Sequence, residues 1–249
     1  MINFFRTIRK GLLSENKLTK YLFYALGEII LVVIGILIAL QINDWNTAKK
    51  SREKEVSYLS EIKASLQQDI ISIDSVLRFN ETKVPIVQGM MHIFNDSLTN
   101  TERVGIFNTY SNPFTNYMVF SPQKTAFTNM IEAETIDLVQ ESELRKALIN
   151  YYEFDYAGGV QFRVRQMNRR IIDKAYPQFF TRENTQTLLN LSTELPTNAE
   201  LQIHKEKWLL SELYGLIYII NLQNQGLNDF RKNIEDLIQL IDITLNSTS

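Results

Sequence analysis

A long apolar segment near the N-terminus constrains the fold of this chain more than any other feature. Residues 21–40 read YLFYALGEIILVVIGILIAL, and Glu28 is the only Asp, Glu, Lys, Arg or His among them. A helix of about 20 residues, rising about 1.5 Å per residue, spans the hydrocarbon core of a bilayer. We therefore predict a transmembrane helix over residues 18–43, with Tyr21, Tyr24 and Trp45 as interfacial aromatic residues.

Two other interpretations of this segment are weaker. A buried core helix is normally amphipathic, whereas this segment is apolar on nearly every side. A cleaved signal peptide needs a small-residue cleavage site after its apolar run, and residues 40–43, LQIN, make a poor one. We therefore expect the segment to remain in the protein as an uncleaved signal anchor.

The charges around the segment favour one orientation by a small margin. Four basic residues follow it closely, and five lie at or before its start, namely Arg6, Arg9, Lys10, Lys17 and Lys20. Basic residues are enriched on the cytoplasmic side of membrane proteins. We therefore predict a cytoplasmic segment over residues 1–17 and an exported domain over residues 44–249. Residues 1–13 have apolar side chains at helical spacing, which fits an interfacial amphipathic helix or a frayed basic tail.

The segment from Lys20 to Asn46 contains a long and unusual pattern, GEI-LVVIGILIALQIN-WN. Together with residues 1–17, it resembles the N-terminal signature of an uncharacterised bacterial family of single-span membrane proteins, a domain of unknown function. The resemblance covers residues 1–55, with a weaker echo over residues 126–152. It implies a bacterial cell envelope, an uncleaved anchor in the inner (cytoplasmic) membrane, and a periplasmic C-terminal domain. It implies no activity and no catalytic residue.

One face of the predicted anchor carries Tyr21, Tyr24, Glu28, Gly35 and Ala39. At about 100° per residue, the other four lie within about 40° of Glu28 around the helix axis. Gly35 and Ala39 form a small-xxx-small pair, which lets a second helix approach closely. A carboxyl group facing lipid is costly, so this face is predicted to pack against a second copy or another membrane protein. A hydrated Glu28 near the headgroups remains the alternative.

The remainder of the chain is predicted to be all-α. Apolar residues recur at steps of three and four along the segment that follows the anchor, at Val56, Leu59, Ile62, Leu66, Ile70, Ile73 and Leu77. This pattern predicts a helix that continues from the anchor to about residue 80. Pro85 and Gly89 predict a break or kink near the start of a second helix, which runs to about residue 94. We expect loop with short helical pieces over residues 95–122. Further helices are expected from residue 141 to Pro177, kinked at residues 158–159, and from residue 198, together forming an antiparallel bundle.

Composition excludes several classes of function. The net charge of −2 gives no general attraction to nucleic acid, and the absence of cysteine excludes disulfides and thiolate metal sites. His92 and His204 are the only histidines, too few for a typical zinc site. No nucleotide-binding or hydrolase motif occurs. We therefore predict no catalytic residue, no metal and no cofactor.

Two charged groups are candidate binding residues. The acidic group at Glu132, Glu134, Asp137, Glu141 and Glu143 is best interpreted as a solvated face, since it lacks EF-hand spacing. The densest basic group consists of Arg163, Arg165, Arg169 and Arg170. These arginines are candidate contacts for an anionic ligand, with salt bridges to acidic helices as the more ordinary use.

The sequence favours a non-enzymatic, membrane-anchored envelope protein that acts as an oligomeric scaffold or interaction module. Its expected partners are the lipid bilayer and a second copy or another membrane protein. The alternative is a ligand-sensing helical bundle that signals through a membrane partner. A small molecule bound in a bundle pocket would favour this alternative, whereas an extensive symmetric apolar contact would favour the scaffold.

Overall fold

The computed structural model describes residues 18–247, and every regular element in this range is a helix. The predicted amphipathic segment at residues 1–17 lies outside the described residues. The chain divides into two compact units, Met1–Val56 and Ser57–Ser249. The predicted fold class, a long apolar N-terminal helix followed by a helical domain, is confirmed.

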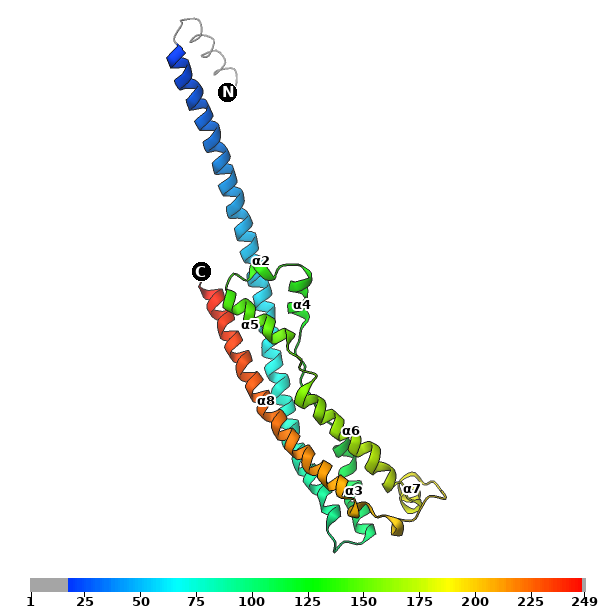
Figure 1. Cartoon of the computed structure of the whole chain (residues 1–249). Helices are drawn as coiled ribbons and strands as arrows, with labels where there is room; N and C mark the ends of the chain where they lie inside the picture. The colour runs from blue at the N-terminus through cyan, green and yellow to red at the C-terminus, as the bar shows by residue number, and fades with distance from the viewer. Residues whose placement is uncertain (1–17, 248–249) are drawn as a thin grey trace. The chain divides into compact units, whose positions relative to one another are not determined.

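The described part of the first unit belongs to one helix, α2 (Leu18–Met91), which continues into the second unit (Figure 1). Its N-terminal stretch is long and apolar enough to cross a membrane. None of this stretch is buried inside the protein, whereas the core helix of a soluble protein would be covered by its neighbours. Length, composition and exposure therefore agree with the predicted span.

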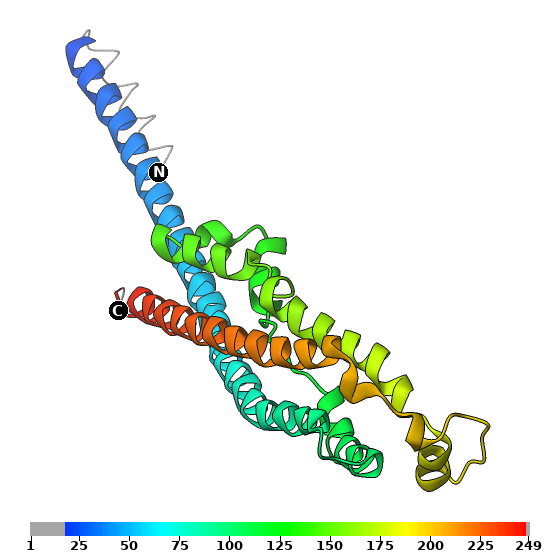
Figure 2. The ribbon, with the colours of Figure 1, turned by 60° about the horizontal axis from the view of Figure 1, so that its bottom comes forward.

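In the second unit α2 packs beside an antiparallel helix, α8 (Lys207–Asn246), as both ribbon views show (Figures 1 and 2). The side chains that α2 buries recur at steps of three and four and include the predicted Leu59, Ile62, Leu66 and Ile73. The predicted Val56 is exposed, and Glu55 is buried in its place. Three cross-contacts define the pairing: Lys63 with Asp242, Asp74 with Arg231, and Asn80 with Gln223. Residue numbers rise along α2 as they fall along α8, so the predicted antiparallel arrangement is confirmed.

A third long helix, α6 (Gly159–Phe179), lies antiparallel to α8. Arg170 of α6 pairs with Glu212 of α8 at 3.0 Å, and the Met167 side chain lies against Gly215. Shorter helices complete the unit: α3 (Asn100–Thr115), α4 (Thr125–Glu132), α5 (Ser142–Glu153) and α7 (Arg182–Leu189), with single 3-10 turns η1 (His92–Phe94), η2 (Ile136–Leu138), η3 (Asn198–Glu200) and η4 (Ile203–Lys205).

The second unit contains two hydrophobic cores. One joins α2 with α4, α5 and the C-terminal half of α8, and includes Leu66 and Tyr152. The other joins the end of α2 with α3, α6 and the N-terminal half of α8, and includes Phe114 and Leu216. Where α2 passes from one core to the other, it buries polar side chains, among them Asn80 and Lys83.

Of the two expectations for Pro85 and Gly89, the helix break is wrong, because α2 continues through both to Met91. Pro85 removes the hydrogen bond to the carbonyl of Glu81, but both residues are exposed, so water can replace that bond. Gly89 is buried against the Tyr110 ring, and a Cβ there would lie 2.3 Å from its Cζ. The glycine therefore permits close packing of α3 on α2.

The expectation of loop over residues 95–122 is also wrong in part, since α3 occupies sixteen of these positions. The helix begins with a capping box. The Glu102 backbone N–H donates to the Thr99 hydroxyl at 3.3 Å, and the Thr99 backbone N–H donates to the Glu102 carboxylate at 2.7 Å. This motif satisfies N–H groups at the start of a helix whose apolar periodicity is weak.

The helix expected from residue 141 to Pro177 is two helices, α5 and α6, rather than one kinked helix. Helix α5 already ends at Glu153, where Phe154 is extended, and Gly159, in a left-handed conformation with φ +54°, is the first residue of α6. Pro177 lies inside the last turn of α6 and does not end the helix before it. The last helix begins at Lys207 rather than near residue 198, after turns η3 and η4.

Candidate functional site

The predicted packing face of the anchor is uncovered in the described chain. Glu28, Gly35 and Ala39 are all exposed, and a Cβ built on Gly35 would meet no heavy atom within 4 Å. Tyr21 and Tyr24 lie in the same helix, but their side chains lie outside the described part of the structure. The face therefore offers room for a second helix, and its partner stays a prediction.

The four arginines predicted to contact an anion divide into different environments. Arg165 and Arg169 line a shallow hollow of about 380 Å³ with Tyr117 and Phe162. The Arg165 guanidinium already donates to the Ala157 carbonyl at 2.5 Å. In a separate pair of contacts, Arg169 lies 3.5 Å from Asp173 and Arg170 lies 3.0 Å from Glu212. Arg163 is exposed and does not line the hollow, so the structure does not gather the four into one site.

The histidines and the acidic group form no evident metal site. His92 and His204 lie in the neighbouring turns η1 and η4. The five acidic residues predicted as a solvated face are all exposed, and Asp137 lies 3.3 Å from Arg145. Within residues 18–247, no three His, Asp or Glu side chains come together as metal ligands would.

A buried carboxyl group, Asp69, lies in the first core and was missed by the sequence analysis. The Tyr151 hydroxyl donates to one carboxyl oxygen at 2.8 Å, and the Gln123 backbone N–H donates to the other at 2.9 Å. Burial of the charge raises the pKa of Asp69 above its usual value, although both hydrogen bonds oppose the rise. Asp69 lies three residues after Leu66 and four before Ile73, and this helical spacing is the sequence feature that indicates its burial.

A buried amine, Lys83, lies in the second core and was also missed. Its Nζ donates to the backbone carbonyls of Phe114 and, at 2.7 Å, Asn116. The Asn168 amide donates to the intervening carbonyl, that of Thr115, at 2.8 Å. Together these side chains cap the C-terminal end of α3, where a positive charge is favourable. Burial nevertheless lowers the pKa of Lys83 to about 8.

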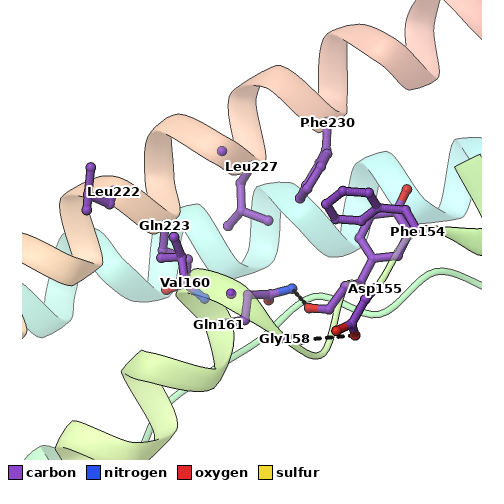
Figure 3. A pocket seen from close by; sticks show the side chains of 12 residues that line it. Phe154, Asp155, Gly158, Val160, Gln161, Leu222, Gln223, Leu227 and Phe230 are labelled. Atoms are coloured by element: carbon purple, nitrogen blue, oxygen red, sulfur yellow. Dashed lines mark hydrogen bonds between the residues drawn. The ribbon is translucent and has the colours of Figure 1, made fainter.

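An apolar pocket of about 230 Å³ lies where the segment between α5 and α6 meets α8 (Figure 3). Three aromatic rings pack edge-to-face along it. Their centroids lie 4.9 Å apart for Phe154 and Tyr156, 5.2 Å for Phe154 and Phe230, and 5.0 Å for Tyr156 and Phe230. Figure 3 shows Leu227 and Phe230 of α8 on the side of Phe154, and Leu222 farther along α8, on the side of Val160. The pocket therefore has an aromatic end and an aliphatic end.

The two amide side chains that line the pocket are already hydrogen-bonded. Gln161 accepts from the Phe120 N–H at 2.5 Å, and its amide nitrogen donates to the carbonyls of Phe120 and Tyr156. Gln223 accepts from the Asn80 amide at 2.9 Å and donates to the Met118 carbonyl at 3.1 Å. These groups stabilise the walls, and what remains for a ligand is an apolar surface.

Three glycines line the same pocket. Gly159 adopts its left-handed conformation, and a Cβ at Gly158 would lie 2.2 Å from the Asp155 carboxylate. Gly226 differs from both, because it lies inside α8 and a Cβ there would meet no heavy atom within 4 Å. A glycine within a helix costs about 1 kcal/mol relative to alanine. The packing of the protein therefore gives no reason for Gly226.

Comparison with known proteins assigns the chain to one family. A family model described as a family of unknown function, DUF6090, matches residues 28–164. This range is more than half of the 249 residues and runs from the anchor into α6. No curated protein matches the chain, and no solved structure matches it. The predicted resemblance to an uncharacterised family is confirmed, whereas its bacterial origin and single span stay predictions.

Proposed function

Because the chain belongs to DUF6090, a family of unknown function, we propose its role from its own residues. It is a non-enzymatic interaction module, anchored by one helix in a bacterial inner membrane and assembled through that helix with a second copy. The observation that carries this proposal is the anchor face that the described residues leave exposed, which combines Glu28 with the small residues Gly35 and Ala39.

The energetic argument rests on the difference between this face and the rest of the helix. Leu and Ile gain little by leaving lipid for another helix, since lipid is equally apolar. A glycine permits close contact between backbones, and a carboxyl group gains by leaving the hydrocarbon. Self-association through Gly35 and Glu28 is therefore favoured over association through the large apolar side chains.

The membrane and orientation belong to the same proposal. The basic residues at the start of the anchor support a cytoplasmic N-terminus and a periplasmic helical domain. A reporter that works only outside the cytoplasm, fused after Ser249, should be active. Activity of a cytoplasm-only reporter at that position would reverse the orientation.

The buried ionisable groups support a non-enzymatic role. Asp69 is held by a tyrosine hydroxyl and a backbone N–H, and Lys83 is held by backbone carbonyls. Neither lines the apolar pocket or the hollow beside Arg165. Groups engaged in this way connect helices to one another, as structural polar networks do.

Replacing Gly35 with Leu tests the proposed assembly. The added side chain blocks the close approach of two anchors, so dimerisation should weaken roughly tenfold, as a loss of about 1.4 kcal/mol gives. The assembly is measured by cross-linking and native mass measurement of the intact protein in mild detergent. Ile36→Leu is the matched control, since Ile36 lies about 80° round the helix from Glu28 at about 100° per residue.

Two outcomes would contradict the interface. An identical assembly for wild type and Gly35→Leu would show that this face is not the contact. A monomeric wild-type protein would exclude self-association and leave another membrane protein as the partner.

The ligand-sensing alternative is favoured by one observation, the apolar pocket between α6 and α8. In that role the domain binds a small molecule, and a membrane partner carries the signal onward.

A further inference from the structure

The pocket beside Phe154, Phe230 and Gly226 offers space that the protein's own side chains leave unfilled. Its volume of about 230 Å³ exceeds the roughly 150 Å³ of a dry apolar cavity that holds benzene. We propose that this pocket binds an uncharged molecule with a single substituted aromatic ring. All residues that line the pocket belong to the second unit, so this proposal is independent of the proposed assembly of the anchor.

The hydrogen bonds of the walls and the charge of Asp155 disfavour an anionic ligand. The amides of Gln161 and Gln223 are bonded to the backbone and to Asn80, so they offer a ligand little further polar contact. An anionic group placed here would lose its hydration without a compensating partner. Asp155 lies at the pocket with its carboxylate bonded to the Gly158 N–H, and its negative charge disfavours anions further.

The arrangement of the rings favours an aromatic ligand over a cation. Cation-binding aromatic sites surround the charge with ring faces. Here Phe154, Tyr156 and Phe230 contact one another, with centroids about 5 Å apart, which leaves no space for a cation between them. A further ring can extend this edge-to-face cluster, a geometry that aromatic pairs prefer. Phe154 is 50% exposed, so it retains ring surface for such a contact.

Gly226 lines the pocket and leaves space there that a larger side chain would fill. A good helix former such as alanine or leucine would favour the helical conformation of α8 more than glycine does, and its Cβ would meet no heavy atom within 4 Å. Because the fold does not require glycine at this position, the open space beside it has a use other than packing. The geometry of Gly226 therefore identifies the residue whose replacement should fill the site without disturbing the helix.

The test uses the full chain in lipid nanodiscs, with 4-fluorotoluene as the probe observed by fluorine NMR. Wild type should give saturable binding. Gly226→Leu should weaken that binding more than tenfold, because its side chain occupies the pocket. Gly105→Leu is the matched control, since Gly105 also lies in a helix with no heavy atom within 4 Å of a Cβ, but does not line the pocket. Partition of the probe into lipid is the same for all variants.

Gly226→Ala provides a smaller change, with an expected several-fold loss and an unaltered circular dichroism spectrum. Absence of saturable binding to wild type would overturn the proposal, as would equal binding by wild type and Gly226→Leu. Equal affinity for tetramethylammonium would overturn the uncharged ligand class. Gly35→Leu should bind the probe as wild type does, so failure of the anchor interface and failure of this site are distinguished.

Discussion

Replacing Lys83 with Met should remove a pH dependence of stability that the wild-type protein carries. Lys83 is 2% exposed, and the groups that face its ammonium are carbonyl oxygens, the Asn168 amide oxygen and the Phe114 ring. These partners offset only part of the lost hydration, so the pKa is lowered from 10.5 to about 8. Methionine has a similar length and no charge.

The sign of the effect follows from proton binding. Between pH 8 and 10.5 the unfolded chain keeps the Lys83 proton while the folded protein releases it. The unfolded state therefore binds more protons, and the free energy of unfolding rises with pH in this range. The two pKa values predict a gain of roughly 2 kcal/mol between pH 7 and pH 9.5. Well below pH 8, Lys83 is charged in both states, so the free energy of unfolding is reduced by the full cost of burying its charge.

The assay is denaturant unfolding of the intact protein in mild detergent, followed by circular dichroism at a series of pH values. The difference in unfolding free energy between wild type and Lys83→Met should grow in favour of wild type from pH 7 to 9.5. Taking this difference cancels the contributions of other groups, including buried tyrosines such as Tyr151. Parallel curves for the two proteins would show that Lys83 is not desolvated as described.

Two further substitutions have expected outcomes. Asp69→Leu should lower the free energy of unfolding by about 1–3 kcal/mol in denaturant titrations, because the Tyr151 hydroxyl and Gln123 N–H lose their acceptor. Asp69→Asn should lower the free energy of unfolding by less. In wild type, the folded state keeps the Asp69 proton at pH values where the unfolded chain has lost it, so stability falls as pH rises from 3.8 through the raised folded pKa. Asp69→Asn should remove this fall. Gly89→Ala should lower the melting temperature, at a cost of about 1–3 kcal/mol from its clash with Tyr110; Gly105→Ala, which meets no neighbour, should not.

Most of the fold follows from local patterns, and the parts that do not have identifiable causes. The apolar steps from Leu59 to Ile73 predict the buried face of α2 correctly. The same steps continue through Asp69, Asn80 and Lys83, but a polar residue in such a pattern does not reveal its partner. Asp69 is bonded by Tyr151, 82 positions along the chain, and Lys83 by Phe114, 31 positions along.

The candidate pocket could not be predicted from sequence, because it depends on how two distant segments meet. One wall comes from residues 154–161 and the other from residues 222–230. The glycine pair at residues 158–159 predicts an irregularity in the helix, but α5 already ends at Glu153, before the pair, and α6 begins at Gly159. Gly226 gives only a weak signal, an isolated glycine in a helical pattern, which is meaningful once its surroundings are known.

The position of the pocket explains how ligand binding could affect the whole helical unit. Tyr156 and Leu227 belong to the first core, whereas Val160 and Leu222 pack against the second. Asn80 and Gln223 join α2 to α8 at this boundary, and such buried polar pairs hold two helices in register. A ligand here would contact both cores at once and would stabilise the folded unit according to its concentration relative to its dissociation constant. Binding at this boundary would therefore stiffen the joint between the two cores, which a ligand buried within either core alone would not do.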